Sequence, residues 1–316
     1  MDAKGVIMNI ALIGLGVIAE KYISAMETEK DIRICYVCDI RKTLLAKELS
    51  SKYEFFYDYH KIPVKNLDYI FITTPPETHY EITSYFLGRK ANVLLEKPAT
   101  PDLSSLEKII AAANDNRVLF DVIFHWRFGN EAIFLQNNPA LLSDFTKISV
   151  VVQDPYFQEG KIIDSKLHLG GAWLDSGVNA LSFLADFIDL NQLVLVDSES
   201  RIDSESGFDY YAKRVYHYRD ALVEIIVDWN PDINKKQTFA YNGDRLLYVD
   251  HSNQAVYLDN KLLYQENETD RLVTHYHNFF SSLKNHAFDL QMVYDVHKVL
   301  FSVKGGNKTN GQNEKD

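Results

Sequence analysis

The stretch NIALIGLGVIAEKYISAMET, residues 9–28, decides the fold of the first third of the chain. Its first seven residues are mostly apolar and predict a buried strand, while VIAEKYISAMET has the apolar spacing of a helix. The turn between them is GLGVIA, residues 14–19. Gly14 permits a tight turn, Gly16 leaves room for a pyrophosphate, and Ala19 still allows close packing of the helix. The phosphates of a dinucleotide would lie at the helix N-terminus, where free amide groups bind anions.

The alternation of strand and helix continues to about residue 125. Apolar strands are predicted in IRICYVCD, LDYIFITTP, ANVLLEKP and RVLFDVIF, with helical patterns between them. Such strands, when helices join them, are typical of a parallel sheet that is covered on both faces. Residues 1–125 are therefore predicted to form a doubly wound, dinucleotide-binding α/β domain.

After residue 125 the pattern changes to consecutive strands. These strands are predicted in LVLVDSES, FDYYAKRVYHYRD, ALVEIIVDW, KQTFAYN, RLLYVD and QAVYLD. Short turns such as Asn242-Gly243 separate some of them, which indicates an antiparallel sheet. Helical patterns return in DRLVTHYHNFFSSLKN and DLQMVYDVHKVLFSVK, so residues 126–304 are predicted to form an α+β domain. Residues 305–316 are polar and glycine-bearing, and a disordered tail is expected there.

Composition excludes several classes of function. The formal net charge of -11 argues against binding to nucleic acid or to anionic membranes. The two cysteines, Cys35 and Cys38, lie three apart on a predicted strand, so they face opposite sides and should not form a disulfide. The absence of a disulfide framework and of a targeting signal predicts a cytoplasmic protein. No metal site is expected, since His275 and His277 would diverge on a helix.

An acid ends the second predicted strand. Asp39 follows the glycine turn by about twenty residues, where a ribose-binding carboxylate belongs. It would accept hydrogen bonds from the ribose hydroxyls of NAD and repel the 2′-phosphate of NADP, while Arg41 could receive that phosphate. The alternative is that Asp39 only caps the following helix. We therefore expect NAD as the cofactor, with NADP possible.

Two further loops follow strands at the edge of the sheet where the ligand crevice lies. In TTPPETH, residues 73–79, prolines would hold the loop against the cofactor, and His79 is either a cofactor contact or structural. In EKPAT, residues 96–100, Pro98 fixes the backbone and so presents Lys97 in a set direction. Close to a nicotinamide cation, the Lys97 ammonium would be less basic than usual and could exchange a proton with a substrate hydroxyl.

These motifs together resemble the Gfo/Idh/MocA oxidoreductase family. The resemblance is carried by Gly14-Leu15-Gly16-Val17-Ile18-Ala19, by Thr74-Pro75 with His79, and by Glu96-Lys97-Pro98. It implies an NAD(P)-dependent enzyme that acts on sugars, inositols or related polyols. It also implies a Rossmann domain and a second domain whose large, mainly antiparallel open sheet carries substrate contacts and often the oligomer interface. The expected cofactor-binding residues are Gly14, Gly16, Val17, Ile18, Ala19, Asp39, Arg41, Thr73, Thr74, Pro75, His79, Glu96 and Lys97.

The same resemblance assigns a role to GGAWLDSGVNALS, residues 170–182. Asp175 and Asn179 would share one face of a helix, either as a capping device or directed at a ligand. In many family members this helix reads D-x-x-x-H, and its aspartate and histidine act with the lysine of the EKP motif. Asp175 and Lys97 match that set and are the expected catalytic residues. Asn179 stands where histidine is expected, and an amide cannot take up a proton.

One branch of the family, the L-arabinose and D-galactose 1-dehydrogenases, has asparagine at this position. WLDSGVNALS is similar to its D-P-G-I-N-A-L-S stretch, and FHWRFG is similar to W-H-S-R-F-A. The resemblance implies oxidation of an aldose at C1 to a lactone, with Asn179, His125, Arg127 and Asp154 as substrate-binding residues. Gln153 and Glu159 depart from the branch, which leaves the sugar open.

Two other functions remain open at this point. The first is a polyol, inositol or nucleotide-sugar dehydrogenase that acts at another carbon, and the second is a non-catalytic NAD-binding sugar sensor. Whatever the function, a homodimer or homotetramer through the second sheet is expected, because the predicted helices are too few to cover both of its faces.

Overall fold

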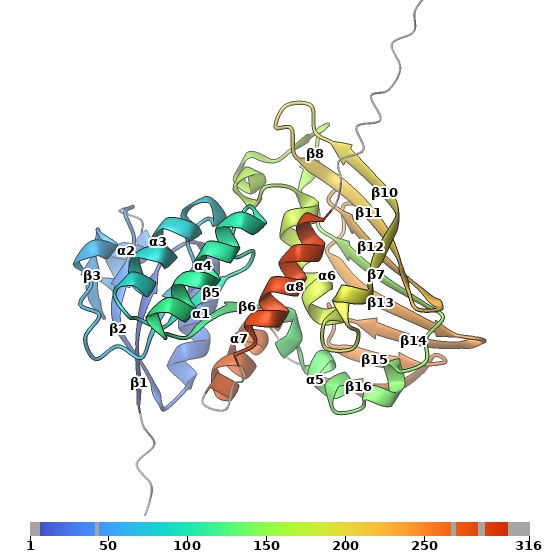
Figure 1. Ribbon diagram of the computed structural model, residues 1–316, viewed down its shortest axis with the longest axis horizontal. Coiled ribbons are helices and arrows are strands. Elements are labelled where there is room, and N and C mark those ends of the chain that lie inside the picture. Colours follow the sequence, from blue (N-terminus) through green and yellow to red (C-terminus); the bar gives the residue numbers. More distant parts are fainter. Residues whose placement is uncertain (1–6, 42–43, 267–269, 284–287, 303–316) are drawn as a thin grey trace, which may run out of the picture.

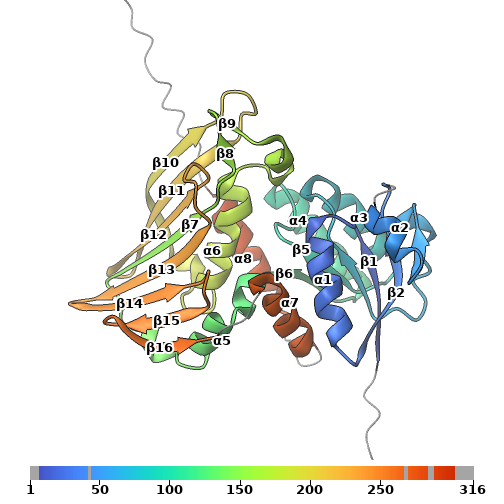
Figure 2. The ribbon, with the colours of Figure 1, turned by 180° about the vertical axis from the view of Figure 1, so that it is seen from behind.

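Figure 1 shows the computed structural model of the chain, in which residues 7–41, 44–266, 270–283 and 288–302 are described. Two sheets dominate the fold, and helices lie between them (Figure 1, Figure 2). The predicted tail, residues 305–316, lies outside the described residues.

The first sheet is parallel and has the strand order β3-β2-β1-β4-β5-β6. Its strands are β1 (Met8–Ile13), β2 (Ile32–Cys38), β3 (Glu54–Phe56), β4 (Tyr69–Ile72), β5 (Val93–Glu96) and β6 (Phe120–Ile123). Its helices are α1 (Val17–Thr28), α2 (Leu44–Leu49), α3 (Pro76–Gly88) and α4 (Leu103–Asn116). The strand order reverses between β1 and β4, and ligands of such sheets bind at the carboxyl ends of the strands at that point. The predicted Rossmann fold is confirmed.

The second sheet has the order β10-β11-β12-β7-β13-β14-β15-β16. Its strands are β7 (Lys147–Gln153), β10 (Val194–Ile202), β11 (Asp209–Tyr218), β12 (Ala221–Asp228), β13 (Lys235–Asn242), β14 (Arg245–Asp250), β15 (Ala255–Leu258) and β16 (Lys261–Gln265). All neighbours are antiparallel except β7 and β12, which are parallel. The mainly antiparallel sheet is therefore confirmed, and β16 is a strand that the sequence pattern did not predict. A short hairpin, β8 (Phe157–Gln158) and β9 (Lys161–Ile162), lies apart from this sheet.

Helices cover one face of the second sheet. Figure 1 and Figure 2 show α6 (Val178–Leu184) and α8 (Leu290–Phe301) on the side toward the first domain, with α5 (Asn130–Gln136) near the β16 edge. Alternate residues of β12, such as Val223 and Ile225, are buried on this side. On the other side, Phe239, Tyr248 and Tyr257 stack in a row with ring centroids 5.1 and 5.6 Å apart, and none of the described helices covers them.

The helix α7 (Arg271–Ser282) returns to the first domain. Its Tyr276, Phe279 and Phe280 join the apolar core that contains β1 and α1. The Tyr276 ring lies 4.1 Å from that of Tyr22 on α1, measured between centroids. The core of the Rossmann domain is thus completed by residues from near the end of the chain, which fixes the two sheets relative to each other.

The cysteines and the helices agree with the sequence analysis where the structure bears on them. Cys35 and Cys38 are both free thiols. Across the described ranges, no helix combines the length and the apolar character that a membrane crossing requires. Within the same ranges, no group of His, Cys, Asp or Glu side chains has the arrangement of a metal site.

Candidate active site

The central contact of the candidate site joins the two domains. The Lys97 ammonium, directly after β5, donates to Asp175 Oδ1 at 2.6 Å and to the Asp175 carbonyl at 2.9 Å. The structure therefore brings together the two residues that the sequence predicts to be catalytic. Burial lowers the pKa of Lys97, but Asp175 and Glu96 more than offset this effect, so the pKa is raised. The less basic lysine expected from sequence refers to a bound nicotinamide cation and stays a prediction; without one, the partner carboxylate outweighs burial.

The segment that carries Asp175 has an unusual local geometry. Trp173–Gly177 form a π-helical turn that leads directly into α6. Such turns occur often at functional sites. The N-cap position, Ala172, makes no side-chain cap hydrogen bond, and the Asp175 carboxylate bonds Lys97 instead. Asp175 is therefore not a helix cap in this structure.

Asn179 lies one turn after Asp175, on the same side of the helix. Its Nδ2 donates to the Asp175 carbonyl at 3.3 Å, so Lys97 and Asn179 share one acceptor. Its Oδ1 is buried, and none of the described residues is a hydrogen-bond partner for it. A buried acceptor without a donor is unfavourable, which makes Oδ1 a natural contact for a ligand hydroxyl.

The helix segment is held from the second sheet by an aspartate that sequence analysis missed. Asp209, at the start of β11, accepts a hydrogen bond from the Trp173 amide at 2.8 Å. Gly171 makes the approach possible, because a Cβ at its position would lie 2.4 Å from Asp209 Oδ1. Burial raises the pKa of Asp209 to about 6. The residue is 36 positions away from Trp173, so no local pattern could have indicated the contact.

A second buried ion pair lies close to the first. Asp154 Oδ1 accepts from the Lys236 ammonium at 2.5 Å, and both side chains are buried. Burial raises the pKa of Asp154 and lowers that of Lys236, and each partner opposes the shift of the other. The charge of Asp175 also acts on both groups, so the two ion pairs share one region. Sequence analysis predicted Asp154 but not Lys236, although a lysine at an inward position of the alternating strand β13 was a usable signal.

His125 is buried rather than open to solvent. Its Nδ1 lies 3.1 Å from Nδ1 of His275 on α7. Burial, and then the charges of Lys97 and Arg271, hold the pKa of His125 well below its usual range. The ring is therefore neutral and acts as a hydrogen-bonding group, not as a cation.

Arg127 has a carboxylate partner within the second domain. Its guanidinium makes a two-pronged ion pair with Asp186, through Nε at 2.9 Å and Nη2 at 2.6 Å to Asp186 Oδ1. This partner compensates the charge of Arg127, and the expected sugar contact stays a prediction.

Two residues that are expected to contact the cofactor also make internal hydrogen bonds. The Glu96 carboxylate accepts from the hydroxyls of Tyr22 and Tyr276 at 2.8 Å each, and from the Lys97 amide at 2.8 Å. It is buried and holds the backbone of Lys97 in place, and its expected contact with a cofactor stays a prediction. His79 is likewise fully buried and lies 2.7 Å from the Thr74 carbonyl and 3.0 Å from the Pro98 carbonyl. It joins the two loops that follow β4 and β5.

The glycine turn fits a pyrophosphate. Gly14 has φ +95°, and a Cβ there would lie 2.7 Å from the Thr74 amide nitrogen, while Thr73 Oγ1 donates to the Gly14 carbonyl at 2.7 Å. These contacts fix the turn against the loop after β4. A Cβ on Gly16 would meet nothing closer than 4.0 Å, so the space beside it is open. Gly16 is also the N-cap of α1 and offers no side-chain acceptor to the first-turn amides.

The other residues of this crevice have distinct positions. Val17 is 88% exposed at the start of α1, whereas Ala19 is buried and packs the helix onto the sheet. Ile18 packs against the apolar core of this domain, and Pro75 is the N-cap of α3. Asp39 accepts from the Leu15 amide at 2.7 Å and from the Arg41 guanidinium, with Nη2 at 3.0 Å. Arg41 is thus paired with Asp39, the carboxylate that would bind ribose. Because the Arg41 side chain is half-exposed, it can turn toward a 2′-phosphate.

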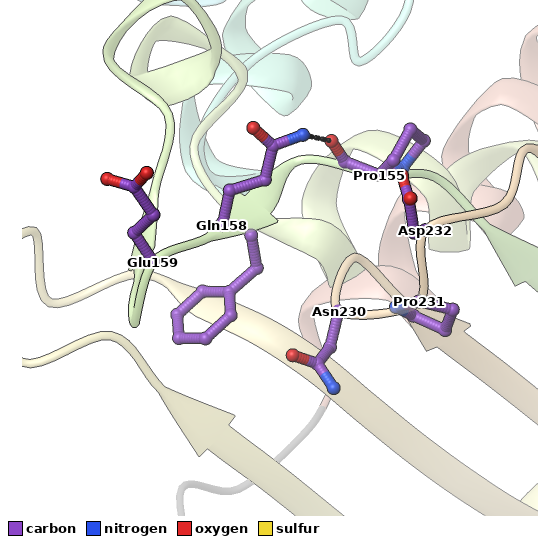
Figure 3. A pocket seen from close by; sticks show the side chains of 7 residues that line it. Pro155, Gln158, Glu159, Asn230, Pro231 and Asp232 are labelled. Carbon is purple, nitrogen blue, oxygen red and sulfur yellow. Dashed lines mark hydrogen bonds between the residues drawn. The ribbon is translucent and has the colours of Figure 1, made fainter.

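A hollow lies next to the Asp154–Lys236 pair. It has a volume of about 390 Å³ and is lined by Pro155, Phe157, Gln158, Glu159, Asn230, Pro231 and Asp232. In Figure 3 the Gln158 amide donates to the Pro155 carbonyl, at 3.1 Å, on one side of it. Neither Lys97 nor Asp175 lines this hollow, so it is a neighbour of the candidate site and not its centre.

Comparison with known proteins agrees with the geometry of the crevice. Residues 8–124 match the family model described as the oxidoreductase family with an NAD-binding Rossmann fold, Gfo/Idh/MocA. The first domain is therefore similar to the NAD-binding domain of this family. The NAD-binding description of the family model agrees with the expected cofactor, NAD with NADP possible. A curated relative, the uncharacterized oxidoreductase YgjR of Escherichia coli K12, is 36% identical over 53 residues, which are 17% of this chain and 16% of the relative.

Solved structures share the fold of both domains of this chain. KijD10, a 3-ketoreductase from Actinomadura kijaniata in complex with NADP and TDP-benzene, has a TM-score of 0.79 at 15% identity, over 93% of this chain and 96% of KijD10. UDP-N-acetylglucosamine 3-dehydrogenase GnnA from Acidithiobacillus ferrooxidans has a TM-score of 0.76 at 15% identity, over 93% and 96% of the two chains. At these identities the likeness shows the fold of both domains.

Proposed function

We propose that this oxidoreductase is an NAD(P)-dependent aldose 1-dehydrogenase, which oxidises the C1 hydroxyl of a cyclic sugar to a lactone. The observation that carries the proposal is the 2.6 Å contact between Lys97 and Asp175 beside an asparagine, Asn179, that cannot transfer a proton. The C1 hydroxyl of a cyclic sugar is more acidic than an ordinary alcohol. One carboxylate can therefore serve as the base where other alcohols would call for a histidine as well.

The raised pKa of Lys97 divides the roles between the two catalytic residues. An ammonium that stays protonated at neutral pH cannot take up a proton, so Lys97 donates a hydrogen bond to the C1 oxygen and stabilises its developing negative charge. Asp175 then accepts the hydroxyl proton. Asn179 Oδ1 accepts a hydrogen bond from a neighbouring sugar hydroxyl, and the Asp154–Lys236 pair binds hydroxyls on the other side.

The cofactor would be held by the first domain. The pyrophosphate would bind beside Gly16 at the N-terminus of α1, and the ribose at Asp39. Bound NAD(P)⁺ would supply the hydride acceptor. Residues 126–304 would form the substrate-binding domain, with α7 tying it to the core of the first domain.

A second candidate is a nucleotide-sugar dehydrogenase, since solved neighbours are described as a 3-ketoreductase with TDP-benzene and a UDP-N-acetylglucosamine 3-dehydrogenase. The hollow of Figure 3 could then hold part of the nucleotide, but Glu159 and Asp232 line it and would repel a diphosphate. A non-catalytic sugar sensor would not require the Lys97–Asp175 pair.

The test is a panel of aldoses and nucleotide sugars with NAD and NADP, followed at 340 nm, with the lactone identified as product. Lys97→Ala and Asp175→Ala should each lower kcat by about a hundredfold to ten-thousandfold. Asn179→Ala should mainly raise KM, by several-fold, as expected for one lost hydrogen bond of about 1 kcal/mol. Asn179→His should retain some activity or change the preferred sugar.

A matched control separates catalysis from stability. Asp102 is exposed and caps α4 through the Ser105 amide at 2.8 Å. Asp102→Ala should lose about 1 kcal/mol of stability and keep normal turnover. An Asp175→Ala variant that behaves in the same way would contradict the proposed role of Asp175.

A further inference from the structure

Arg271 is a charged residue that the roles above leave unused. It is the first residue of α7, directly after Asp270, whose side chain caps the helix. Within the described ranges, its buried Nη1 has no hydrogen-bond partner, and its guanidinium takes part in no ion pair.

Three other cations of this region have a carboxylate partner. Lys97 bonds Asp175 at 2.6 Å, and Lys236 bonds Asp154 at 2.5 Å. Arg127 bonds Asp186 at 2.6 Å. A cation held away from water is unfavourable unless an anion or several acceptors compensate it. Arg271 is partly buried, and the described residues supply it with neither an ion-pair partner nor an acceptor for Nη1.

Its position is beside the candidate site. Burial raises the pKa of Asp154. The charge of Lys236 lowers this pKa, and the charge of Arg271 lowers it to a smaller extent. The guanidinium thus lies within electrostatic reach of the Asp154–Lys236 pair. His275 lies one helical turn after Arg271 on α7 and contacts His125. The charge of Lys97 lowers the pKa of His125, so Lys97 is near this pair of rings. Arg271 and Lys97 therefore border one common region between the two domains.

His275 offers a second unpartnered group on the same face of α7. Its Nε2 is buried without a hydrogen-bond partner, and residues four apart on a helix lie next to each other. Burial, and next the charge of Arg271, hold the pKa of His275 well below its usual range, so the ring is neutral. When His275 Nδ1 accepts from His125, its single proton lies on Nε2. Two adjacent donors, one of them charged, match two oxygens of an anionic group.

The nearby carboxylates are already engaged. Asp154 is held by Lys236, and Glu131 Oε1 bonds His251 Nδ1 at 2.8 Å. Glu131 Oε2 has no partner, and Glu131 is the acid that acts most strongly on Arg271. The competing arrangement is a water molecule between Arg271 and Glu131 Oε2, in which case a neutral sugar would bind.

We propose that the sugar substrate carries an anionic substituent, a carboxylate or a phosphate, which binds to Arg271 and His275 while the reacting hydroxyl lies at Lys97 and Asp175. The proposal rests on the proposed function and narrows its substrate class to acidic sugars. Asn179 Oδ1 and Arg271 Nη1 would then be satisfied by the same ligand, one by a hydroxyl and the other by the anion.

The experiment compares matched sugars with the full-length protein and NAD or NADP. D-galactose is paired with D-galacturonate, and D-glucose with D-glucuronate and D-glucose 6-phosphate, so the arms separate carboxylate from phosphate. The wild type should prefer one anionic member over its neutral counterpart by at least about tenfold in kcat/KM. Arg271→Met should lower kcat/KM for that anionic sugar by about 10- to 100-fold, mainly through KM, and change the neutral sugar by less than about threefold. Arg271→Lys should recover part of the loss.

The control is Arg89→Met, which removes the same charge from an exposed arginine stacked on Tyr85 in the first domain. It should leave both sugars unaffected. Equal use of neutral and anionic sugars, or an equal effect of Arg271→Met on both, would overturn the proposal in favour of the water-bridged arrangement.

Binding measured by calorimetry without cofactor separates this proposal from the proposed function. If no sugar is turned over, the dehydrogenase assignment fails. Binding of D-galacturonate or D-glucose 6-phosphate by the wild type, abolished in Arg271→Met but not in Arg89→Met, would still support the anion site. No binding of either anion to the wild type would overturn it.

Discussion

Asp209 provides a prediction whose magnitude follows from the structure. Its carboxylate accepts from the Trp173 amide and so holds the segment that carries Asp175, and burial raises its pKa from 3.8 to about 6. Arg214, whose guanidinium lies 5.0 Å from the Trp173 ring centre, is the charged side chain that acts on Asp209, and it only partly opposes the effect of burial. The ionised form of Asp209 is therefore the unfavourable one in the folded protein.

The direction of the effect on stability follows from proton binding. The unfolded chain protonates Asp209 near 3.8 and the folded protein near 6, so the folded protein binds more protons between these values. The contribution of Asp209 to stability is therefore present at low pH and is lost as pH rises through about 6. At about 1.4 kcal/mol per pH unit, the interval from 3.8 to about 6 corresponds to about 3 kcal/mol.

The assay is urea unfolding of the wild type and Asp209→Asn at pH 4, 5, 6 and 7. Asparagine keeps an oxygen that can accept from the Trp173 amide, and it does not titrate, so all other ionisable groups cancel in the difference. The wild type should gain about 3 kcal/mol relative to the variant as pH falls from 7 to 4. If the difference in the free energy of unfolding between the two proteins does not change with pH, or if it favours the wild type at pH 7, the role assigned to Asp209 is refuted.

Three further outcomes are expected. Asp39→Ser should shift cofactor preference toward NADP, because it frees Arg41 and removes the carboxylate that repels a 2′-phosphate; a wild type that already strongly prefers NADP, by kcat/KM, would contradict this. Gly171→Ala should destabilise the protein by about 1–3 kcal/mol in urea unfolding, since its φ is +108° and its Cβ would lie 2.4 Å from Asp209 Oδ1; an unchanged midpoint would show that the contact can relax. Light scattering at micromolar concentration should give a homodimer or homotetramer through the uncovered face of the second sheet, and a monomer would exclude it.

Sequence alone could predict the parts of the site that are coded locally. The glycine turn, Asp39 and Lys97 each follow a strand directly, and in a doubly wound sheet such positions meet at one edge. The pair Asp175 and Asn179 was visible because four residues separate neighbours on a helix. The π-helical turn at Trp173–Gly177 shifts the local geometry but still leaves both residues facing the same ligand side.

The contacts that sequence analysis missed join distant segments. Arg127 has a carboxylate partner 59 positions away. Glu96 accepts from Tyr276, which is 180 positions away. Neither partner can be derived from spacing, because the burial that makes each contact favourable exists only once these distant segments have packed.

The helix α7 lies near the end of the sequence, yet it packs against the first domain and carries two polar residues of the candidate site. Its apolar side packs into the core of the Rossmann domain through Tyr276, Phe279 and Phe280. Its other groups, Arg271 and His275, border the substrate side, where two of their polar atoms have no partner. A helix that completes a core can hold unpaired polar groups in place, because its apolar packing offsets their cost. α7 thus joins the core of the first domain to the neighbourhood of Asp154, and this packing would hold Arg271 in place for the proposed anionic sugar.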